Sequence, residues 1–311
     1  MSKRIDNIPK PAHPDKRESP LPWHQPKPGE EDPSVAQRIT AILQSPSYEE
    51  GDQDKEFLNQ ADTRGVRLQV DYLKAELILK KHNIEKTIVV FGSTRIPEPA
   101  SAQHKVDKLR SELKGKGELK SLKRQLDVAE RILNKSQYYE ISRELGRLIS
   151  QLGDLVVVTG GGPGMMEAAN RGADDVNAQT IGLNVGLPHQ QYPNPYITPD
   201  LCFQFHYFAI RKLHFLLRAK ALVVFPGGYG TFDELFETLT LIQTRKIKPV
   251  PVVLVGESYW RQAFNVDFLV DEGVIDEEDR ELFWYAESAE EIWEGIRHWY
   301  EVCGEPLLSK H

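Results

Sequence analysis

Four short runs of apolar, largely β-branched residues constrain the fold of this chain more than any other feature of its sequence. Polar and apolar positions do not alternate within them, which indicates strands that are covered on both faces, as in a parallel sheet. The runs occupy residues 87–91, 154–159, 221–225 and 250–255, and a weaker one spans residues 179–185.

Helical patterns separate these apolar runs. Strands that alternate with helices indicate a doubly wound, Rossmann-like α/β fold, in which helices cover both faces of a parallel sheet. We expect the helices at residues 139–152, 165–177, 208–219, 232–242 and 290–300.

The N-terminal region differs from the rest in composition. Residues 1–35 contain eight of the 20 prolines, which lack an amide donor and oppose helix formation. We therefore expect residues 1–52 to form a largely extended or disordered tail, with one short amphipathic helix over residues 35–43.

A helical arm is expected over residues 53–85, between this tail and the Rossmann-like main domain that spans residues 86–311. The arm is expected to lie on the main body. Its signal is an apolar stripe at three- and four-residue spacing, formed by Val66, Val70, Leu73 and Leu77.

Residues 102–135 interrupt the alternation of strands and helices. The segment is dense in Lys, Arg and Glu, with leucines between the charges, and it predicts a helical hairpin inserted after the first strand. Two interpretations are open. The hairpin is either a solvated helix pair, as charge runs usually are, or an element that covers the pocket or a subunit contact.

Charge and composition exclude several classes of function. Lys and Arg number 39 against 46 Asp and Glu, giving a net charge of −7, which argues against a nucleic-acid partner. No apolar run approaches the roughly 18 residues of a membrane span, so no membrane partner is expected. Two cysteines do not make a disulfide framework, and the nine histidines show no metal-ligand spacing. We expect a cytoplasmic protein without a metal site.

The first glycine-rich loop follows the strand predicted at residues 154–159. Its glycines can approach a ligand closely, and the next helix points its amide groups into the same space. The dinucleotide fingerprint fails, however, because Met165 occupies the position of its last glycine, and no Gly-Lys-Ser/Thr sequence closes a P-loop. A tight structural turn and a binding loop are both open interpretations for Gly160, Gly161, Gly162 and Gly164.

The second glycine-rich loop, residues 226–231, predicts a phosphate cradle. It connects the strand at 221–225 directly to a helix, so its backbone amides and the Thr231 hydroxyl face a ligand at the helix start. Glu234 follows in the first turn. Acids there are commonly mere partners of the helix dipole, but beside a phosphate cradle this carboxylate would lie close to a bound sugar phosphate.

Arg211 and Lys212 lie on the preceding helix. Adjacent helical residues project in different directions, so only one of the two is expected to reach a given pocket. The guanidinium group suits phosphate or a carboxylate partner, whereas a solvated pair is the ordinary alternative.

Together these motifs resemble the lonely-guy (LOG) family, often mislabelled lysine decarboxylases, in its longer bacterial form. The P-G-G-x-G-T-x-x-E motif of residues 226–234 is the most specific of them. The others, in order, are residues 91–95, 159–173, 194–196, 211–212 and 239–244.

This resemblance implies a hydrolase that acts on N-glycosyl bonds. The family cleaves nucleoside 5′-monophosphates, typically AMP or N6-modified (cytokinin) AMP, to a free base and ribose 5-phosphate. It implies no metal or organic cofactor, a small-molecule substrate, and a homodimer or higher homo-oligomer with the active site near the subunit contact.

The family's functional residues map onto positions of this chain. The resemblance implies catalytic roles for Glu234 and Arg211. It implies a phosphate loop formed by Gly227, Gly228, Gly230 and Thr231. It also implies a nucleotide pocket that includes Gly92, Ser93, Arg95, Gly160, Gly161, Gly162, Gly164, Met165, Glu167 and Lys212.

Three other functions are weighed against this hydrolase. A nucleotide-binding or molybdenum-cofactor carrier of the same fold would bind without turnover. A lysine decarboxylase needs a Schiff-base lysine, and Lys212 lacks a recognisable set of partners for that role. A dinucleotide-dependent oxidoreductase is disfavoured by the failed fingerprint.

Overall fold

The computed structural model describes residues 8–116, 120–188 and 192–308. Within them, seven strands form one parallel sheet in the order β4-β3-β2-β1-β5-β6-β7. The doubly wound, Rossmann-like α/β fold predicted from the apolar runs is confirmed. The strands are β1 (Thr87–Phe91), β2 (Val156–Thr159), β3 (Thr180–Val185), β4 (Cys202–Phe205), β5 (Ala219–Val224), β6 (Val252–Val255) and β7 (Trp284–Ala286).

The direction of winding reverses beside β1. The chain proceeds outward from β1 through β2 and β3 to β4, then returns to place β5 against the other side of β1 and continues to β7. Open α/β sheets bind ligands at such a switch point, outside the carboxyl ends of the strands. The topology alone therefore directs attention to the loops after β1 and β5.

Both faces of the sheet are covered, which explains why the central strand β1 is buried along its whole length. Successive residues of a strand point to opposite faces. In β1, Ile88 and Val90 pack into one core with α6 (Gln137–Ser150), α7 (Met165–Asp174) and α12 (Ala289–Cys303). Val89 and Phe91 pack into the other core, whose helical side comes from α3 (Arg64–Lys81), α8 (Phe208–Leu217) and α9 (Tyr229–Gln243).

Several short elements complete the main body. The edge strands β4 and β7 had no counterpart among the predicted runs, because they are short and only partly covered. Two short helices, α10 (Glu257–Ala263) and α11 (Val266–Asp271), follow β6. Single 3₁₀ turns lie at Pro199–Leu201 and Glu277–Leu282.

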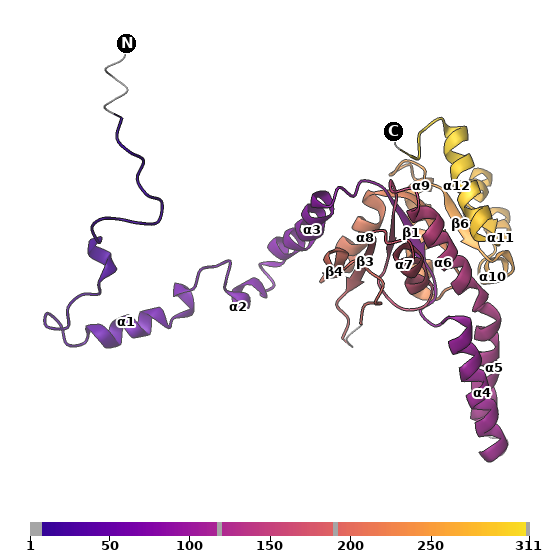
Figure 1. Ribbon diagram of the computed structural model, residues 1–311, viewed down its shortest axis with the longest axis horizontal. Helices are drawn as coiled ribbons and strands as arrows, with labels where there is room; N and C mark the ends of the chain where they lie inside the picture. Colours follow the sequence, from indigo (N-terminus) through magenta and orange to yellow (C-terminus); the bar gives the residue numbers. More distant parts are fainter. Residues whose placement is uncertain (1–7, 117–119, 189–191, 309–311) are drawn as a thin grey trace, which may run out of the picture. The chain divides into compact units, whose positions relative to one another are not determined.

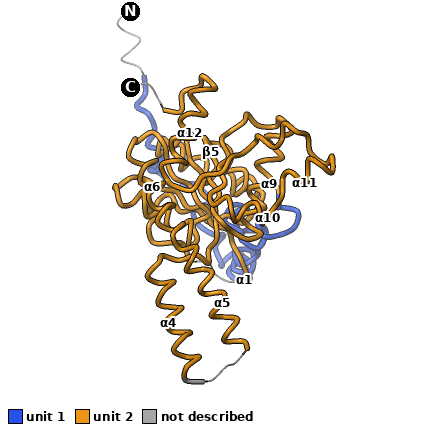
Figure 2. Tube along the Cα trace, turned by 90° about the vertical axis from the view of Figure 1, so that its right-hand side faces the viewer, with its two compact units in different colours: residues 1–64 blue, residues 65–311 orange. Residues whose placement is uncertain are grey.

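The predicted insert is a helical hairpin of α4 (Pro99–Lys116) and α5 (Lys120–Lys135), which projects from the body (Figures 1 and 2). It has a small apolar core of its own, formed by Val106, Leu109, Leu122 and Ala129 with three partly buried leucines. An ion pair between Arg110 and Glu130, 2.8 Å from Nη2 to Oε1, also joins the two helices. The hairpin is thus a packed element.

The chain divides into two compact units, residues 1–64 and 65–311 (Figure 2). In the described part of the first unit, the predicted helix is confirmed as α1 (Val35–Leu43), and α2 (Lys55–Leu58) follows. The 3₁₀ turns are Pro22–His24 and Pro46–Tyr48. The division after residue 64 differs from the boundaries predicted at residues 52 and 85, because α3 packs with the sheet.

Helix α3 lies on the main body with a different face from the expected one. Ala75 and Leu79 are buried against the sheet side, and the Asp71 carboxylate accepts hydrogen bonds from the amides of His206 and Tyr207 (3.1 and 2.9 Å). The stripe that predicted the helix is exposed; it comprises Val66, Val70, Leu73 and Leu77. Period identifies a helix, but here it does not identify the face that packs.

Candidate active site

A cavity of about 750 Å³ opens at the carboxyl ends of β1 and β5. The loops after the two strands are tied together, since the Ser93 amide donates a 2.9 Å hydrogen bond to the Pro226 carbonyl. The cavity therefore lies at the switch point of the sheet. The lining residues from these loops and from α9 are Gly92, Ser93, Thr94, Arg95, Ile96, Pro226, Gly227, Gly228, Tyr229, Gly230, Thr231 and Glu234.

The predicted phosphate cradle forms the floor of this cavity at the start of α9. Gly228 is the N-cap residue, and its carbonyl accepts hydrogen bonds from the amides of Thr231 and Phe232 (2.9 and 3.0 Å). The first amides of an α-helix have no acceptor within the helix and carry its positive dipole end. An anionic group in the cavity would meet both.

The three glycines of the cradle differ in the space that a Cβ atom would have at each position. A Cβ atom at Gly227 would lie 2.1 Å from Oγ1 of Thr231, so packing requires glycine there. A Cβ atom at Gly228 or Gly230 would meet nothing within 4 Å, and neither residue has a positive φ. Protein packing therefore does not explain these two glycines, whereas close approach of a ligand would.

Glu234 lies one helical turn after Gly230, so its carboxylate is on the cradle side of α9. Only 5% of the residue is exposed, yet it lines the cavity. Burial raises the pKa of Glu234 to about 7, although the positive charges of Arg211 and Lys212 oppose the shift. A carboxyl group with this pKa can exchange a proton near neutral pH.

Arg211 reaches the same cavity from α8. Its Nε donates a 2.6 Å hydrogen bond to the Leu183 carbonyl in β3, and its guanidinium carbon lies 5.1 Å from the ring centroid of Phe215. Burial lowers the pKa of Arg211, while the charge of Glu234 opposes that shift. The guanidinium group is thus fixed by backbone and aromatic contacts, beside a carboxylate it attracts.

Lys212 points elsewhere, as the prediction that only one of the two adjacent cations reaches a pocket requires. Its Nζ lies 2.9 Å from Oδ1 of Asp233 and 2.9 Å from Oε2 of Glu237. It is not among the residues that line the cavity. Lys212 therefore links α8 to α9 and does not form the pocket wall expected of it.

The first glycine-rich loop is filled by protein atoms. A Cβ atom at Gly161 would lie 1.7 Å from Oδ1 of Asn184, one at Gly164 2.3 Å from the Ser93 carbonyl oxygen, and one at Gly160 2.6 Å from Nη2 of Arg211. Both Gly161 and Gly164 have positive φ. All four predicted loop glycines are buried and none lines the cavity. The structure thus favours the tight-turn interpretation.

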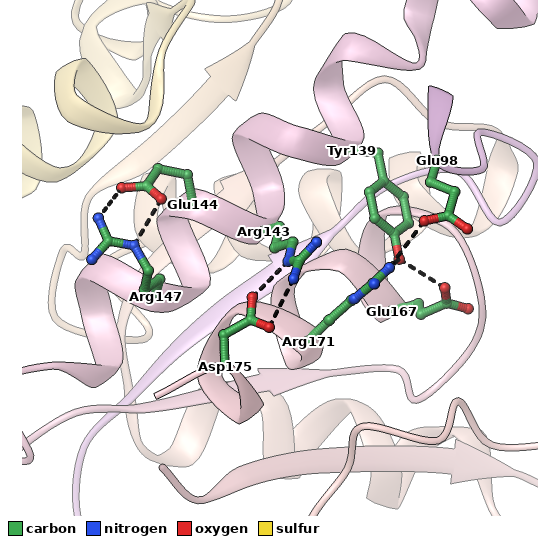
Figure 3. Close-up of polar contacts among 8 residues, drawn as sticks. All are labelled: Glu98, Tyr139, Arg143, Glu144, Arg147, Glu167, Arg171 and Asp175. Atoms are coloured by element: carbon green, nitrogen blue, oxygen red, sulfur yellow. Dashed lines mark hydrogen bonds and ion pairs between the residues drawn. The ribbon is translucent and has the colours of Figure 1, made fainter. Parts of the chain in front are cut away.

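Two further residues predicted for the nucleotide pocket lie outside the cavity. Met165 is fully buried in a hydrophobic core, and it is the neighbouring Met166 that lines the cavity. Glu167 accepts a 2.8 Å hydrogen bond from the Tyr139 hydroxyl (Figure 3). Adjacent helical residues diverge by about 100°, so sequence alone does not show which methionine faces a ligand.

Glu167 belongs to a polar network that joins α6 and α7 (Figure 3). The Arg171 guanidinium pairs with Glu98 at 3.0 Å and lies beside the Tyr139 hydroxyl at 3.5 Å. Arg143 and Asp175 form a second pair with two hydrogen bonds, of 2.5 and 2.8 Å. This network fixes the helix that follows the first glycine loop, and we assign it a structural role.

Other cavity-lining residues were not predicted. Phe208 and Tyr259 carry no motif signal, and Tyr259 donates a 2.5 Å hydrogen bond to the Gly227 carbonyl of the cradle. Four residues come from α5 of the insert, namely Val128, Arg131, Ile132 and Lys135. Their contribution depends on how the hairpin folds back, which local sequence does not specify.

No group of three or more His, Cys, Asp or Glu residues in residues 8–116, 120–188 and 192–308 is arranged to hold a metal ion. No helix in the same ranges combines the length and the apolar character that a bilayer crossing requires.

The chain is similar in sequence to known proteins. A family model described as "Possible lysine decarboxylase" matches residues 166–296. The cytokinin riboside 5′-monophosphate phosphoribohydrolase LOG3 of Arabidopsis thaliana is 30% identical over 181 residues, which cover 57% of this chain and 81% of that protein. The corresponding enzyme LOG of Oryza sativa subsp. japonica is 29% identical over 161 residues, which cover 51% and 65%.

A solved structure is also similar. The molybdenum cofactor carrier protein of Chlamydomonas reinhardtii is 19% identical, with a TM-score of 0.41, over 69% of this chain and 97% of that one.

Proposed function

The chain belongs to the lonely-guy (LOG) family, and on this premise we propose that it hydrolyses the N-glycosidic bond of a nucleoside 5′-monophosphate. The substrate would be AMP or an N6-modified AMP of the cytokinin type, and the products a free base and ribose 5-phosphate. One observation carries the proposal: a buried carboxyl group with a pKa of about 7 lines the same cavity as an open glycine cradle, one helical turn away.

The cradle would hold the 5′-phosphate. Amide groups and the helix dipole at the start of α9 attract a dianion, and Thr231 adds a hydroxyl group. These contacts lie away from the bond that breaks, so their binding energy serves to position the ribose against Glu234.

Glu234 would act at the anomeric carbon. Cleavage of a glycosidic bond passes through a state with positive charge on that carbon, which a carboxylate stabilises. The same carboxylate accepts a proton from the attacking water, whose oxygen bonds to the anomeric carbon as the bond to the base breaks. The base takes up one proton from solvent and Glu234 returns one to solvent, so the reaction consumes one water in all. Arg211 attracts the Glu234 carboxylate and so favours its charged form.

The test compares Glu234→Gln with the wild type in single-turnover assays on a panel of nucleoside monophosphates. Release of adenine and ribose 5-phosphate from AMP is expected to fall by about a thousandfold, the order of loss of a group acting on the transition state. Glu237→Gln is the matched control, since Glu237 lies on the same helix and pairs with Lys212. Wild-type-like release by Glu234→Gln would remove Glu234 from the mechanism, and binding without turnover by the wild type would favour a carrier.

The geometry gives no support to decarboxylation through Lys212. That role needs a lysine that reaches the substrate, whereas Lys212 is held by two carboxylates outside the cavity. We therefore do not propose lysine decarboxylation at this site, although the matching family model is described as "Possible lysine decarboxylase".

We also propose a homodimer formed through the exposed stripe of α3. Val66, Val70, Leu73 and Leu77 present a row of apolar side chains, and Leu213 and Leu217 are exposed on α8, which packs beside α3. Apolar surface of this kind marks interaction sites. Light scattering is expected to show a dimer for the wild type and a monomer for Leu73→Asp; a wild-type monomer would contradict the proposal.

A further inference from the structure

The insert hairpin reaches the active-site cavity along one face of α5. Val128, Arg131, Ile132 and Lys135 recur at three- and four-residue spacing, which places them on a single side of the helix, and all four line the cavity. The apolar core between α4 and α5 uses other residues of α5, among them Leu122 and Ala129, and holds the helix against α4. The insert is therefore a wall of the site, and its solvated-hairpin interpretation does not apply to this end of α5.

The two cations on this wall have no acidic partner among the residues that the structure describes. No ion pair involves Arg131 or Lys135 there, and the Lys135 Nζ donates only a 3.4 Å hydrogen bond to the Arg131 carbonyl. By contrast, Glu130, on another side of the same helix, is occupied by Arg110. The guanidinium and ammonium groups that face the cavity are thus available to an anion.

The charge balance of the cavity favours an anionic ligand. Four cations line it, and Glu234 is the single carboxylate among its described lining residues. Two of these cations, Arg131 and Lys135, come from the insert, and the others are Arg95 and Arg211. Arg211 is turned toward Leu183 and attracts Glu234, so it is committed to the catalytic side.

Lys135 lies on the cradle side of the cavity. It shares a second, smaller hollow of about 550 Å³ with Tyr259, whose hydroxyl donates to the Gly227 carbonyl. Lys212 on α8 is occupied by Asp233 and Glu237. The cradle and its own helix therefore supply amide groups, and the charge that would neutralise a phosphate is left to Arg95 and to the two cations of α5.

We propose that Arg131 and Lys135 of the insert bind the phosphate of the substrate, as the cationic half of a site whose backbone half is the glycine cradle. The inference rests on the proposed function only in taking a nucleotide as the ligand. Charge-assisted hydrogen bonds to phosphate are the stronger class of such contacts, and arginine adds a planar fork that suits phosphate oxygens. Specificity for the phosphorylated over the free nucleoside would then depend on the insert.

The experiment measures binding by calorimetry for three probes, AMP, ribose 5-phosphate and adenosine, with the full chain. In the double variant Arg131→Ala/Lys135→Ala, Kd is expected to rise at least about tenfold for AMP and for ribose 5-phosphate, with no change for adenosine. The variant Arg131→Lys/Lys135→Arg is expected to recover most of the affinity.

The matched control is Lys108→Ala/Lys123→Ala, which removes the same charge from the same hairpin at positions outside the cavity. It is expected to bind all three probes as the wild type does. Equal weakening by both double variants, equal loss of adenosine binding, or unchanged binding of both phosphorylated probes would overturn the inference.

The proposed function is tested separately by turnover. A wild-type protein that binds ribose 5-phosphate through Arg131 and Lys135 but releases no base from any nucleotide would refute the hydrolase and leave this inference standing. A wild type that hydrolyses AMP, with a KM unchanged in Arg131→Ala/Lys135→Ala, would do the reverse.

Discussion

The two glycine-rich loops of this protein look alike in sequence and differ in what fills them. The loop after β2 is occupied by side chains and carbonyl groups of the protein itself, from Asn184, Ser93 and Arg211. The loop after β5 leaves the space beside Gly228 and Gly230 empty of protein atoms. Glycine content alone therefore does not identify a binding loop; the environment of the missing Cβ atom shows which glycines the packing of the protein requires.

Positive φ follows the same division. Gly161 and Gly164 have φ values of +72° and +73°, which side-chain-bearing residues rarely adopt, whereas no glycine of the cradle lies in that region. The filled loop therefore needs its glycines for conformation and packing. We propose that ligand binding accounts for Gly228 and Gly230 of the open loop.

The largest effect is expected from Gly161→Ala. The new Cβ would overlap Oδ1 of Asn184 in a buried loop and would also strain a residue with positive φ, so the free energy of unfolding is expected to fall by about 4 kcal/mol or more. Urea unfolding measures it. Gly153→Ala is the control for backbone strain alone, because φ is +76° there and a Cβ would meet nothing within 4 Å. An equal loss of unfolding free energy in both variants would show that the contact with Asn184 adds nothing to the backbone strain.

An intermediate effect on stability is expected from the burial of Glu234, which follows the open loop. Its pKa is raised in the folded protein to about 7, from an ordinary value of 4.5, so folding favours the protonated form. The contribution of Glu234 to stability is thus fully present below about pH 4.5 and is lost as pH rises through 7. Relative to Glu234→Gln, the wild type is expected to lose about 2 kcal/mol between pH 5 and pH 8 in urea unfolding. If the unfolding free energies of the wild type and Glu234→Gln changed in parallel with pH, the pKa of Glu234 would not be raised by folding.

The smallest effect on stability, with the opposite sign, is expected from Gly230→Ala. Alanine favours the first turn of α9 and its Cβ enters open space, so the free energy of unfolding is expected to rise by about 0.5 kcal/mol. The same methyl group would occupy ligand space, and calorimetry is expected to show AMP binding weakened at least about tenfold. A variant that is more stable and binds AMP normally would break the distinction between the two loops.

Sequence predicted the interior of the fold better than its margins. The central strands were found because burial on both faces makes their runs continuously apolar, as in Thr87–Phe91. The edge strand Cys202–Phe205 was missed because it is partly exposed, and the exposed Gln204 interrupts its apolar pattern. The exposed stripe of α3 misled the assignment of its packed face, since apolar periodicity is equally compatible with a surface left for a partner.

The candidate site was predictable where backbone geometry fixes position. Glu234 follows Gly230 by one helical turn, so any cradle at the start of α9 brings the carboxylate with it. The sequence does not show whether Met165 or Met166 faces the cavity, because that depends on the orientation of the helix. Glu167 accepts a hydrogen bond from Tyr139, which lies 28 residues away in the sequence and could not be identified as its partner. The cations of α5 required the tertiary placement of a hairpin that carries no motif.

The hairpin also stands at a particular point of the chain, within the crossover that leads from β1 to β2. Crossover connections can lengthen without altering the strands that they join, since the added residues remain outside the sheet. A pocket wall carried on such a connection is modular: its charge and shape can be exchanged as a block while the cradle and Glu234 stay where they are. Replacing or shortening this one segment is therefore a route to change ligand preference while the sheet and the cradle remain unchanged.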